Sequence, residues 1–303
     1  MSMTNLYFVQ QEMIRYGMSI YFILGIIGNI FNCIIFTRPH YRRSASSIYF
    51  LAFSVFAIFY LILSIGRYFH ALNSVDLQTH SIIFCKTRLY VTHVLGQYLR
   101  FCVVFVCVDR FLATRAGTRI LLVNSIASAK KLLLLMTIVC PLIAIHLPIL
   151  MEIRNNVCSQ FGVYKLAYAI YQLIIVGIAP PVLMSVFSVL AIRSLQRRHS
   201  GHERAKQRDR HLMKMVIVEV ILHIVISIPY SINLLYAALT YSISKSIEQI
   251  EIELFVSFLT TFSIYLISVM PFYLFLLTST LFRKEFFSLF LKYYHRRILP
   301  TIF

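Results

Sequence analysis

The strongest constraint on this chain is a series of seven long apolar blocks, separated by short polar or basic stretches. The blocks cover roughly residues 13–36, 47–70, 84–114, 129–151, 166–195, 212–240 and 252–278. About 20 apolar residues in a helix cross the hydrocarbon core of a bilayer, so each block is long enough to span it. Backbone inside lipid must satisfy its own hydrogen bonds, and a helix does so within one segment. The sequence therefore predicts an all-α membrane protein, a seven-transmembrane helix bundle.

Composition favours lipid over water as the surroundings of this chain. Hydrophobic residues make up 59% of its 303 residues, charged residues only 13%, and the mean hydropathy is +0.77. A soluble domain usually contains about a quarter charged residues. We therefore predict a short N-terminal segment (1–12), a bundle (13–278) and a short tail (279–303). No small-residue cleavage site follows the first block, which is expected to stay as a span.

The basic residues predict the direction in which the chain crosses the membrane. Of 29 Lys and Arg residues, 21 lie in the connections after blocks one, three and five, at the block ends beside them or in the tail, and seven lie on the opposite side. Lys and Arg favour the cytoplasmic side, so the N terminus is expected outside the cell and the C terminus in the cytoplasm, in a multi-pass plasma-membrane protein. The net charge of +18 would then face anionic lipid, which argues against nucleic acid as a partner.

Two of the six cysteines are predicted at the outer face. Cys85 begins the third block and Cys158 lies between the fourth and fifth, whereas the other four fall within blocks. The cell exterior is oxidising, so these two are expected to form a disulfide that ties the intervening loop over the mouth of the bundle. The alternative is two unpaired surface thiols.

The third block ends in Asp109-Arg110-Phe111. Twenty-five residues, about 38 Å of helix, separate Cys85 from Arg110, so the two would mark opposite membrane faces. A guanidinium in low dielectric needs a partner, which Asp109 or another acidic group could supply.

Together, these features resemble a rhodopsin-like G-protein-coupled receptor over nearly the whole chain. Further matches to that family are Gly28-Asn29, Leu51-Ala52, Pro229 between Ile228 and Tyr230, Pro271 followed by Phe272-Tyr273, and Phe282-Arg283 with Phe286. The resemblance implies a receptor, not an enzyme, which binds an extracellular peptide or small molecule and activates a heterotrimeric G protein. It implies no cofactor and no metal.

Activation in this family involves an outward movement of the sixth helix, for which Pro229 would be the pivot because proline removes one backbone hydrogen bond. Asp209 lies twenty residues before Pro229, about 30 Å along that helix, where the family often places an acidic partner for the triplet arginine. We therefore predict an Arg110–Asp209 contact that holds the helix. Asp209 could instead only neutralise its basic loop.

Several family positions are occupied differently here. The second-span Asp position falls near Ala57, the Asn before Pro271 is Met270, and the chain has no Trp, with Ser227 at the sixth-span position. Losing both members of a buried polar pair can be nearly neutral, whereas losing one leaves the other unpaired. The joint loss of Asp and Asn argues against a sodium site in the bundle.

Two charged residues are expected deep in the bundle. Arg100 lies ten residues before Arg110, and Glu219 lies ten before Pro229, with His223 one turn further on. Because ionisable groups inside a membrane are usually paired, we hypothesise an Arg100–Glu219 bridge, with His223 beside it. The alternative is that each finds a separate partner or water.

The outer half of the bundle is the expected ligand pocket. Family positions that bind amines or retinal are occupied by Thr92 and Ile264, which excludes both ligands. The candidate pocket residues are polar or aromatic: Thr92, His93, Gly96, Gln97, Tyr230, Asn233, Tyr236, and Ser257 or Thr261. Glu248, Glu251 and Glu253 near the seventh span could attract a basic neuropeptide, or could simply complement a helix dipole.

The tail predicts an amphipathic eighth helix over Leu281–Tyr294. Its apolar side chains recur every three or four residues, with basic residues between them: Phe282, Phe286, Leu289, Phe290 and Tyr293. Such a helix would lie on the inner leaflet.

The rival classes are a transporter or channel, a membrane enzyme, and a receptor that binds without signalling. The chain shows no internal repeat of the kind that transporters have. Its histidines are scattered, with no catalytic cluster. The altered activation motifs leave the silent receptor open.

Overall fold

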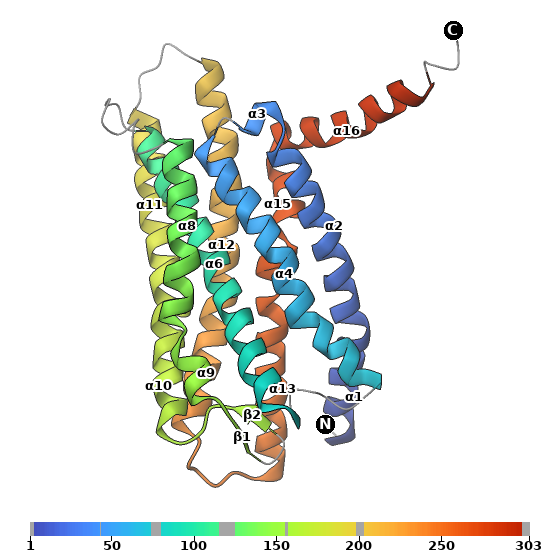
Figure 1. Ribbon diagram of the computed structural model, residues 1–303, viewed down its shortest axis with the longest axis vertical. Coiled ribbons are helices and arrows are strands. Elements are labelled where there is room, and N and C mark those ends of the chain that lie inside the picture. The colour runs from blue at the N-terminus through green and yellow to red at the C-terminus, as the bar shows by residue number, and fades with distance from the viewer. Residues whose placement is uncertain are drawn as a thin grey trace.

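The computed structural model describes residues 3–42, 44–73, 80–114, 125–154, 157–197 and 203–298. Within these ranges, the side chains of residues 3–5, 40, 70–73, 197, 203–211 and 290–298 are not described. The described residues contain seven helices long and apolar enough to cross a membrane, which confirms the predicted bundle. Figure 1 shows them side by side along the long axis of the molecule.

The first two spans run in opposite directions. The first is one continuous helix made of α1 (Met3–Glu12), the π-helical segment η1 (Met13–Gly17) and α2 (Met18–Phe36). A short helix, α3 (Pro39–Arg42), leads to the second span, α4 (Ala45–Asn73). Both helices are apolar all round, as expected of spans that face lipid on one side and protein on the other.

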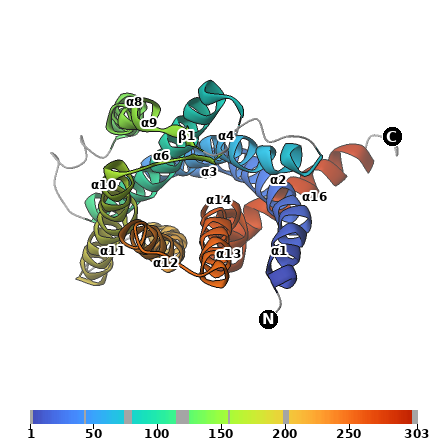
Figure 2. The same ribbon diagram turned by 90° about the horizontal axis from the view of Figure 1, so that it is seen from below.

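The third span, α6 (Ile82–Thr114), is the most buried of the seven. It packs against α4 and against the fifth span. The fourth span, α8 (Ile126–Ile143) with the short α9 (His146–Leu150), has the smallest buried share and lies at the edge of the bundle in Figure 2. The third helix is therefore the central helix of the bundle.

A small antiparallel hairpin follows α9. Strand β1 (Glu152–Arg154) pairs with β2 (Val157–Ser159), with Ile153 opposite Cys158. We call this end of the bundle the hairpin end; it also carries the N terminus (Figure 1). The sequence did not predict these strands, because three residues are too short for a periodic signal.

The fifth and sixth spans complete one side of the bundle. The fifth consists of α10 (Val163–Gln172), the π-helical segment η2 (Leu173–Ile178) and α11 (Ala179–Arg197). The sixth, α12 (Glu203–Leu239), contains Pro229 within the helix. Gly177 of η2 lies against Ser231 of α12, where an added Cβ would come within 2.7 Å of the serine Cβ. These two helices therefore touch closely at a glycine.

The seventh span is broken into three pieces. They are α13 (Ile247–Ile264), α14 (Leu266–Val269) and α15 (Pro271–Thr278), so Pro271 starts a helix instead of kinking one. The span begins five residues earlier than the block predicted at 252, because Ser246 caps α13 and Gln249 completes a capping box. Glu248 and Glu251, which precede the predicted block, therefore belong to the first turns of the helix.

The last helix, α16 (Thr280–Ile298), leaves the bundle sideways at the end opposite the hairpin, which we call the α16 end (Figure 1). Its first turn is attached by aromatic packing of the fully buried Phe282 against Phe36 and Phe275. Arg38 pairs with Glu285 at 3.2 Å and donates to Ser288. Phe290 and Tyr293 of the predicted apolar face lie outside the described side chains.

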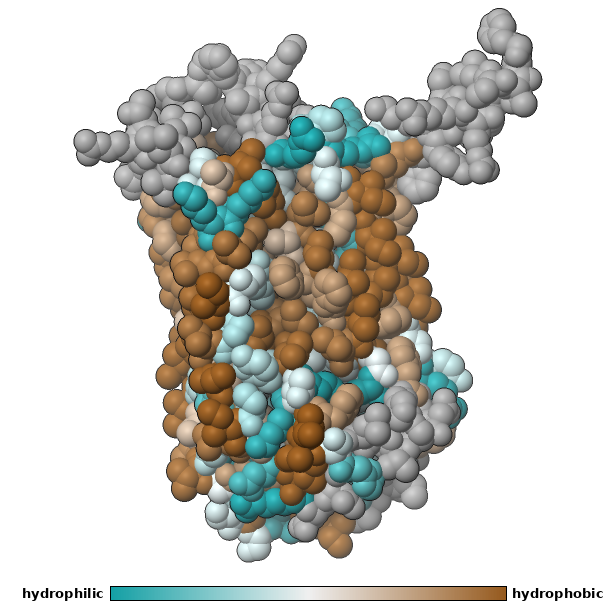
Figure 3. Space-filling view, in the orientation of Figure 1, coloured by the Kyte–Doolittle hydropathy of each residue, from teal (hydrophilic) through white to brown (hydrophobic). Residues whose placement is uncertain are grey.

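The surface agrees with a bilayer around the middle of the bundle. Figure 3 shows hydrophobic residues over most of this face and hydrophilic ones gathered at its two ends. Many of the most exposed side chains are large and apolar, among them Leu134, Leu142, Val225 and Leu254. Such a surface is costly in water and ordinary in lipid. The chain is therefore a multi-pass membrane protein.

Candidate functional site

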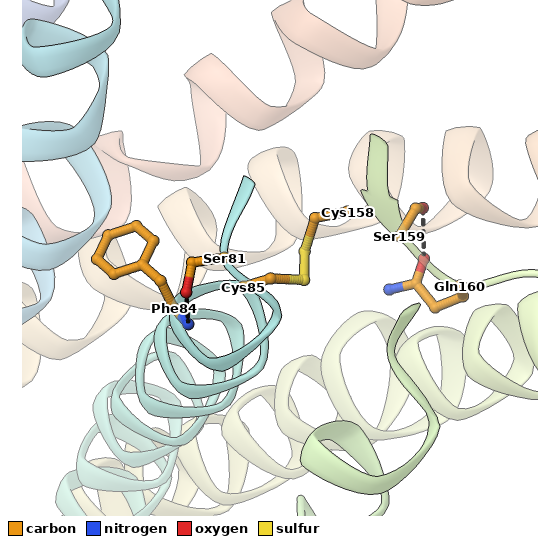
Figure 4. Close-up of a disulfide and its surroundings, with 6 residues drawn as sticks. All are labelled: Ser81, Phe84, Cys85, Cys158, Ser159 and Gln160. Carbon is orange, nitrogen blue, oxygen red and sulfur yellow. Dashed lines mark hydrogen bonds between the residues drawn. A yellow bond between two sulfur atoms is a disulfide. The ribbon is translucent and has the colours of Figure 1, made fainter. Parts of the chain in front are cut away.

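The hairpin end is closed by one disulfide. Cys85, in the first turn of α6, is bonded to Cys158 of β2, with a Cα–Cα distance of 6.0 Å. Figure 4 shows the bond joining the helix to the strand, and this confirms the predicted pair. The bridge closes a loop of 73 residues, so chain-entropy arguments give it about 4 kcal/mol of stability. It holds the hairpin against the start of the third span.

The α16 end of the same helix carries a buried polar cluster. Arg110 Nη2 lies 2.7 Å from Asp109 Oδ2, and both side chains are less than one tenth exposed. Ser46 of α4 also donates to Asp109 Oδ2, and Arg110 donates to Ser44 at 3.2 Å. Sequence reasoning named Asp109 as one of two possible partners for Arg110 but missed the serines, because contacts between distant helices leave no local signal.

The remaining residues of the predicted switch are placed as follows. The ring of Phe111 lies 5.9 Å from that of Phe187 on α11. Tyr273 turns toward the first span, where its hydroxyl donates to the carbonyl of Leu24 at 3.0 Å. The side chain of Asp209 lies outside the described residues, so the Arg110–Asp209 contact stays a prediction.

A cavity of about 230 Å³ lies between these two ends, in the half of the bundle nearer the hairpin. Five of the predicted pocket residues line it: Thr92, His93, Gly96, Tyr230 and Thr261. Sequence reasoning missed most of the wall, which includes Tyr60, Tyr68, Arg67, Arg88, Tyr168, Gln172 and Tyr265. Two of these, Arg67 and Arg88, are among the seven basic residues that the sequence places on the side opposite the tail.

The other predicted pocket residues point elsewhere or bind one another. Asn233 donates to Ser257 across the contact between α12 and α13, at 3.0 Å. Tyr236 donates to Glu253, which also pairs with Lys245 at 2.6 Å. Glu253 is thus already paired with a cation, and among the three glutamates only Glu248 lies in the first turn of α13, where it complements the helix dipole.

A network of polar side chains holds His93 at one side of the cavity. His93 Nε2 lies 2.9 Å from the Tyr171 hydroxyl and 3.3 Å from Gln97 Nε2, while His93 Nδ1 lies 3.4 Å from Gln172 Nε2. Gln97 is almost fully buried and does not line the cavity, so it supports His93 from behind. The histidine is therefore held in place by three neighbours from two helices.

Arg100 lies at the cavity wall, deepest along α6. Its Nη1 donates to the carbonyl of Gly96 at 2.8 Å, the only hydrogen bond that the described residues give this guanidinium. Its Nε is buried without a partner, and the whole residue is 8% exposed. Tyr60 and Tyr230 are within electrostatic reach of the charge.

The hypothesised Arg100–Glu219 bridge does not occur among the described side chains. A helical side chain leans toward the N terminus of its own helix, and α6 and α12 are antiparallel. Arg100 therefore leans toward the hairpin end and Glu219 toward the α16 end, where it approaches Cys107. The similar levels that residue counting predicts for Arg100 and Glu219 therefore do not bring the charges together. Glu219 instead lies 3.7 Å from His223, and neither carboxylate oxygen has a hydrogen bond.

Asn29, a residue of the Gly28-Asn29 pair, joins the first and seventh spans by hydrogen bonds. Asn29 Nδ2 donates to the carbonyls of Gly25 and Ser268, at 2.7 and 2.8 Å. Gly28 lies against Phe272, where an added Cβ would come within 3.1 Å of the Phe272 Cβ. Gly28 therefore lets the first and seventh spans approach closely, and Asn29 joins them by a hydrogen bond.

Comparison with known proteins agrees with this arrangement. A family model described as "7 transmembrane receptor (rhodopsin family)" matches residues 28–273. No curated protein matches the chain. The matched region runs from the Gly28-Asn29 pair to Tyr273, so it contains the disulfide, the cavity and the Asp109-Arg110 cluster.

Proposed function

Because this chain belongs to the rhodopsin family of seven-transmembrane receptors, we propose that it binds an extracellular peptide or small molecule and activates a heterotrimeric G protein. The observation that carries this proposal is the layout of α6. One helix has a disulfide at one end, a cavity beside its middle and a buried Asp109–Arg110 pair at the other end. A ligand in the cavity can therefore act on the same rigid element that ends at the G-protein side.

Orientation follows from the charges at the two ends. We place the hairpin end outside the cell and the α16 end in the cytoplasm of a plasma-membrane protein, since the sequence predicts 21 of the 29 Lys and Arg residues on the same side of the membrane as the tail. A disulfide at the hairpin end is what an oxidising exterior would allow. The helix α16 would then lie along the inner leaflet.

Coupling would come from an outward movement of the inner end of α12. Pro229 interrupts the hydrogen-bond ladder of that helix and supplies a hinge. In the described structure, Arg110 is held by Asp109 and Ser44, which are on α6 and at the start of α4. Release of Arg110 from these groups would make it available to a G protein.

The experiment is nucleotide exchange by purified receptor in lipid nanodiscs with a panel of Gα subunits and Gβγ. Asp109→Asn removes the charge that holds Arg110, so it should raise basal GTPγS uptake above wild type with at least one Gα. Arg110→Ala should abolish it. Arg193→Gln is the matched control, because Arg193 is an exposed arginine on α11, near the α16 end of the bundle where Arg110 lies. If neither wild type nor Asp109→Asn accelerates exchange with any Gα, the chain is a silent receptor or not a transducer, and the proposal fails.

A further inference from the structure

Arg100 is a buried cation that the described residues leave without a counter-ion. It is 8% exposed, lines the cavity, and donates one hydrogen bond, to a backbone carbonyl of its own helix. The guanidinium stays charged in proteins, and a buried charge is stable only when it is paired. Glu219, the carboxylate expected to pair with it, leans away.

The rest of the cavity wall also presents positive charge and hydrogen-bond donors. No Asp or Glu is among the described residues that line it, and two further arginines, Arg67 and Arg88, do. Hydroxyl groups approach from several helices: Ser64, Tyr68, Thr92, Tyr168, Tyr230, Thr261 and Tyr265. Hydroxyls and guanidinium groups both donate hydrogen bonds to anions.

We propose that this cavity binds the carboxylate of its ligand, with Arg100 as the counter-ion; this inference rests on the proposed receptor function and names the ligand class. The planar guanidinium of Arg100 beside hydroxyl donors suits a planar carboxylate, and Arg–carboxylate pairs are among the strongest polar contacts. Tyr60 and Tyr230, both within electrostatic reach of Arg100, would add donors beside it.

The size of the cavity limits what accompanies the carboxylate. Its volume of about 230 Å³ is below the roughly 300–1,000 Å³ of most small-molecule sites. The occupant is therefore a small organic acid, or the free C-terminal carboxylate and last side chain of a peptide whose remainder lies outside. Both sources present the same chemistry to Arg100.

The test is affinity selection on purified receptor in nanodiscs, with bound compounds identified by mass spectrometry. One arm uses benzoate, phenylacetate and 3-phenylpropionate, each beside its amide. The other uses a random hexapeptide pool with free C termini beside the same pool as C-terminal amides. We expect acids to be retained at least about tenfold over amides in one arm or both, and the arm that responds identifies the source.

Three variants test whether retention of acids depends on Arg100. Arg100→Gln keeps hydrogen-bonding ability but not charge, and it should lower acid retention by about tenfold or more. Arg15→Gln is the matched control, an exposed arginine of η1 outside the cavity. In case Arg100→Gln folds poorly, Tyr230→Phe removes only a hydroxyl that makes no hydrogen bond within the described residues, and it should weaken acid retention several-fold.

The outcomes separate this inference from the receptor function. Equal retention of acids and amides, retention of acids unchanged in both Arg100→Gln and Tyr230→Phe, or no acid retained in either arm would overturn the carboxylate assignment. The assay contains no G protein, so its failure leaves nucleotide exchange untouched. Acid retention without any nucleotide exchange would keep the site and remove the signalling role.

Discussion

Replacing Asp109 by alanine should destabilise the inner end of the bundle sharply. The change removes the carboxylate that lies 2.7 Å from Arg110, while the hydroxyl of Ser44, just before α4, still accepts a hydrogen bond from the guanidinium. Both charged side chains are less than one tenth exposed, so water cannot replace the lost partner without opening the helices. Ser46 would lose its acceptor as well.

The magnitude follows from the burial of this pair. Breaking a buried ion pair by removing one partner costs about 3–5 kcal/mol. One kcal/mol shifts Tm by about 2–4 °C in chains of 150–250 residues, and less in longer ones, so we expect a loss of about 6–10 °C. The double variant Asp109→Ala/Arg110→Met removes both charges and should recover at least about 2 kcal/mol of that loss, because the buried guanidinium that lost its carboxylate is removed as well.

The assay is thermal unfolding in nanodiscs, followed with a thiol-reactive dye. Cys102, Cys107 and Cys140 are buried free cysteines, so the dye reports opening of the bundle. Arg193→Gln serves as the control and should leave Tm unchanged. A loss below about 2 °C in Asp109→Ala, or a double variant whose loss equals the sum of the two single losses, would refute this reasoning.

Two further predictions concern packing and the deep charges, and both use the same unfolding assay. Gly177→Ala should lower the free energy of unfolding by about 1–3 kcal/mol, because the new Cβ would meet Ser231. Gly66→Ala is the control: an added Cβ there has nothing within 4 Å, so the variant should be neutral or more stable by up to about 1 kcal/mol. Equal effects of the two variants would mean that the contact with α12 does not matter. Arg100→Met and Glu219→Leu should have additive effects on the free energy of unfolding, since no ion pair joins these side chains. A coupling energy above about 1 kcal/mol in the double variant would show that the two side chains do form a bridge.

The fold was largely predictable because long apolar stretches are enough to identify membrane spans in a sequence. Each of the seven blocks contains a span, and most ends agree within three residues. There are three exceptions. The first helix continues toward the N terminus through Leu6. The seventh span begins at Ile247, after the Ser246–Gln249 capping box, and ends at Val269, because the helix is interrupted before Pro271.

The site was predictable only where it depends on position along one helix. Counting residues along α6 placed Cys85 and Arg110 at its two ends and placed Thr92, His93 and Gly96 on the cavity wall. Counting could not say which way a side chain leans or which helix it faces. That is why the Arg100–Glu219 bridge was wrong for this structure, and why the arginines of the wall were missed.

The central claim is that this chain transmits a signal by moving the inner end of α12, and a distance measurement tests it most directly. Spin labels at Lys130 on α8 and Lys214 on α12 occupy exposed sites near the α16 end. Adding nucleotide-free G protein to the doubly labelled receptor should create a population with a longer distance between the labels, which Arg110→Ala should suppress. A distance distribution that stays the same with every G protein that is tried would contradict the account.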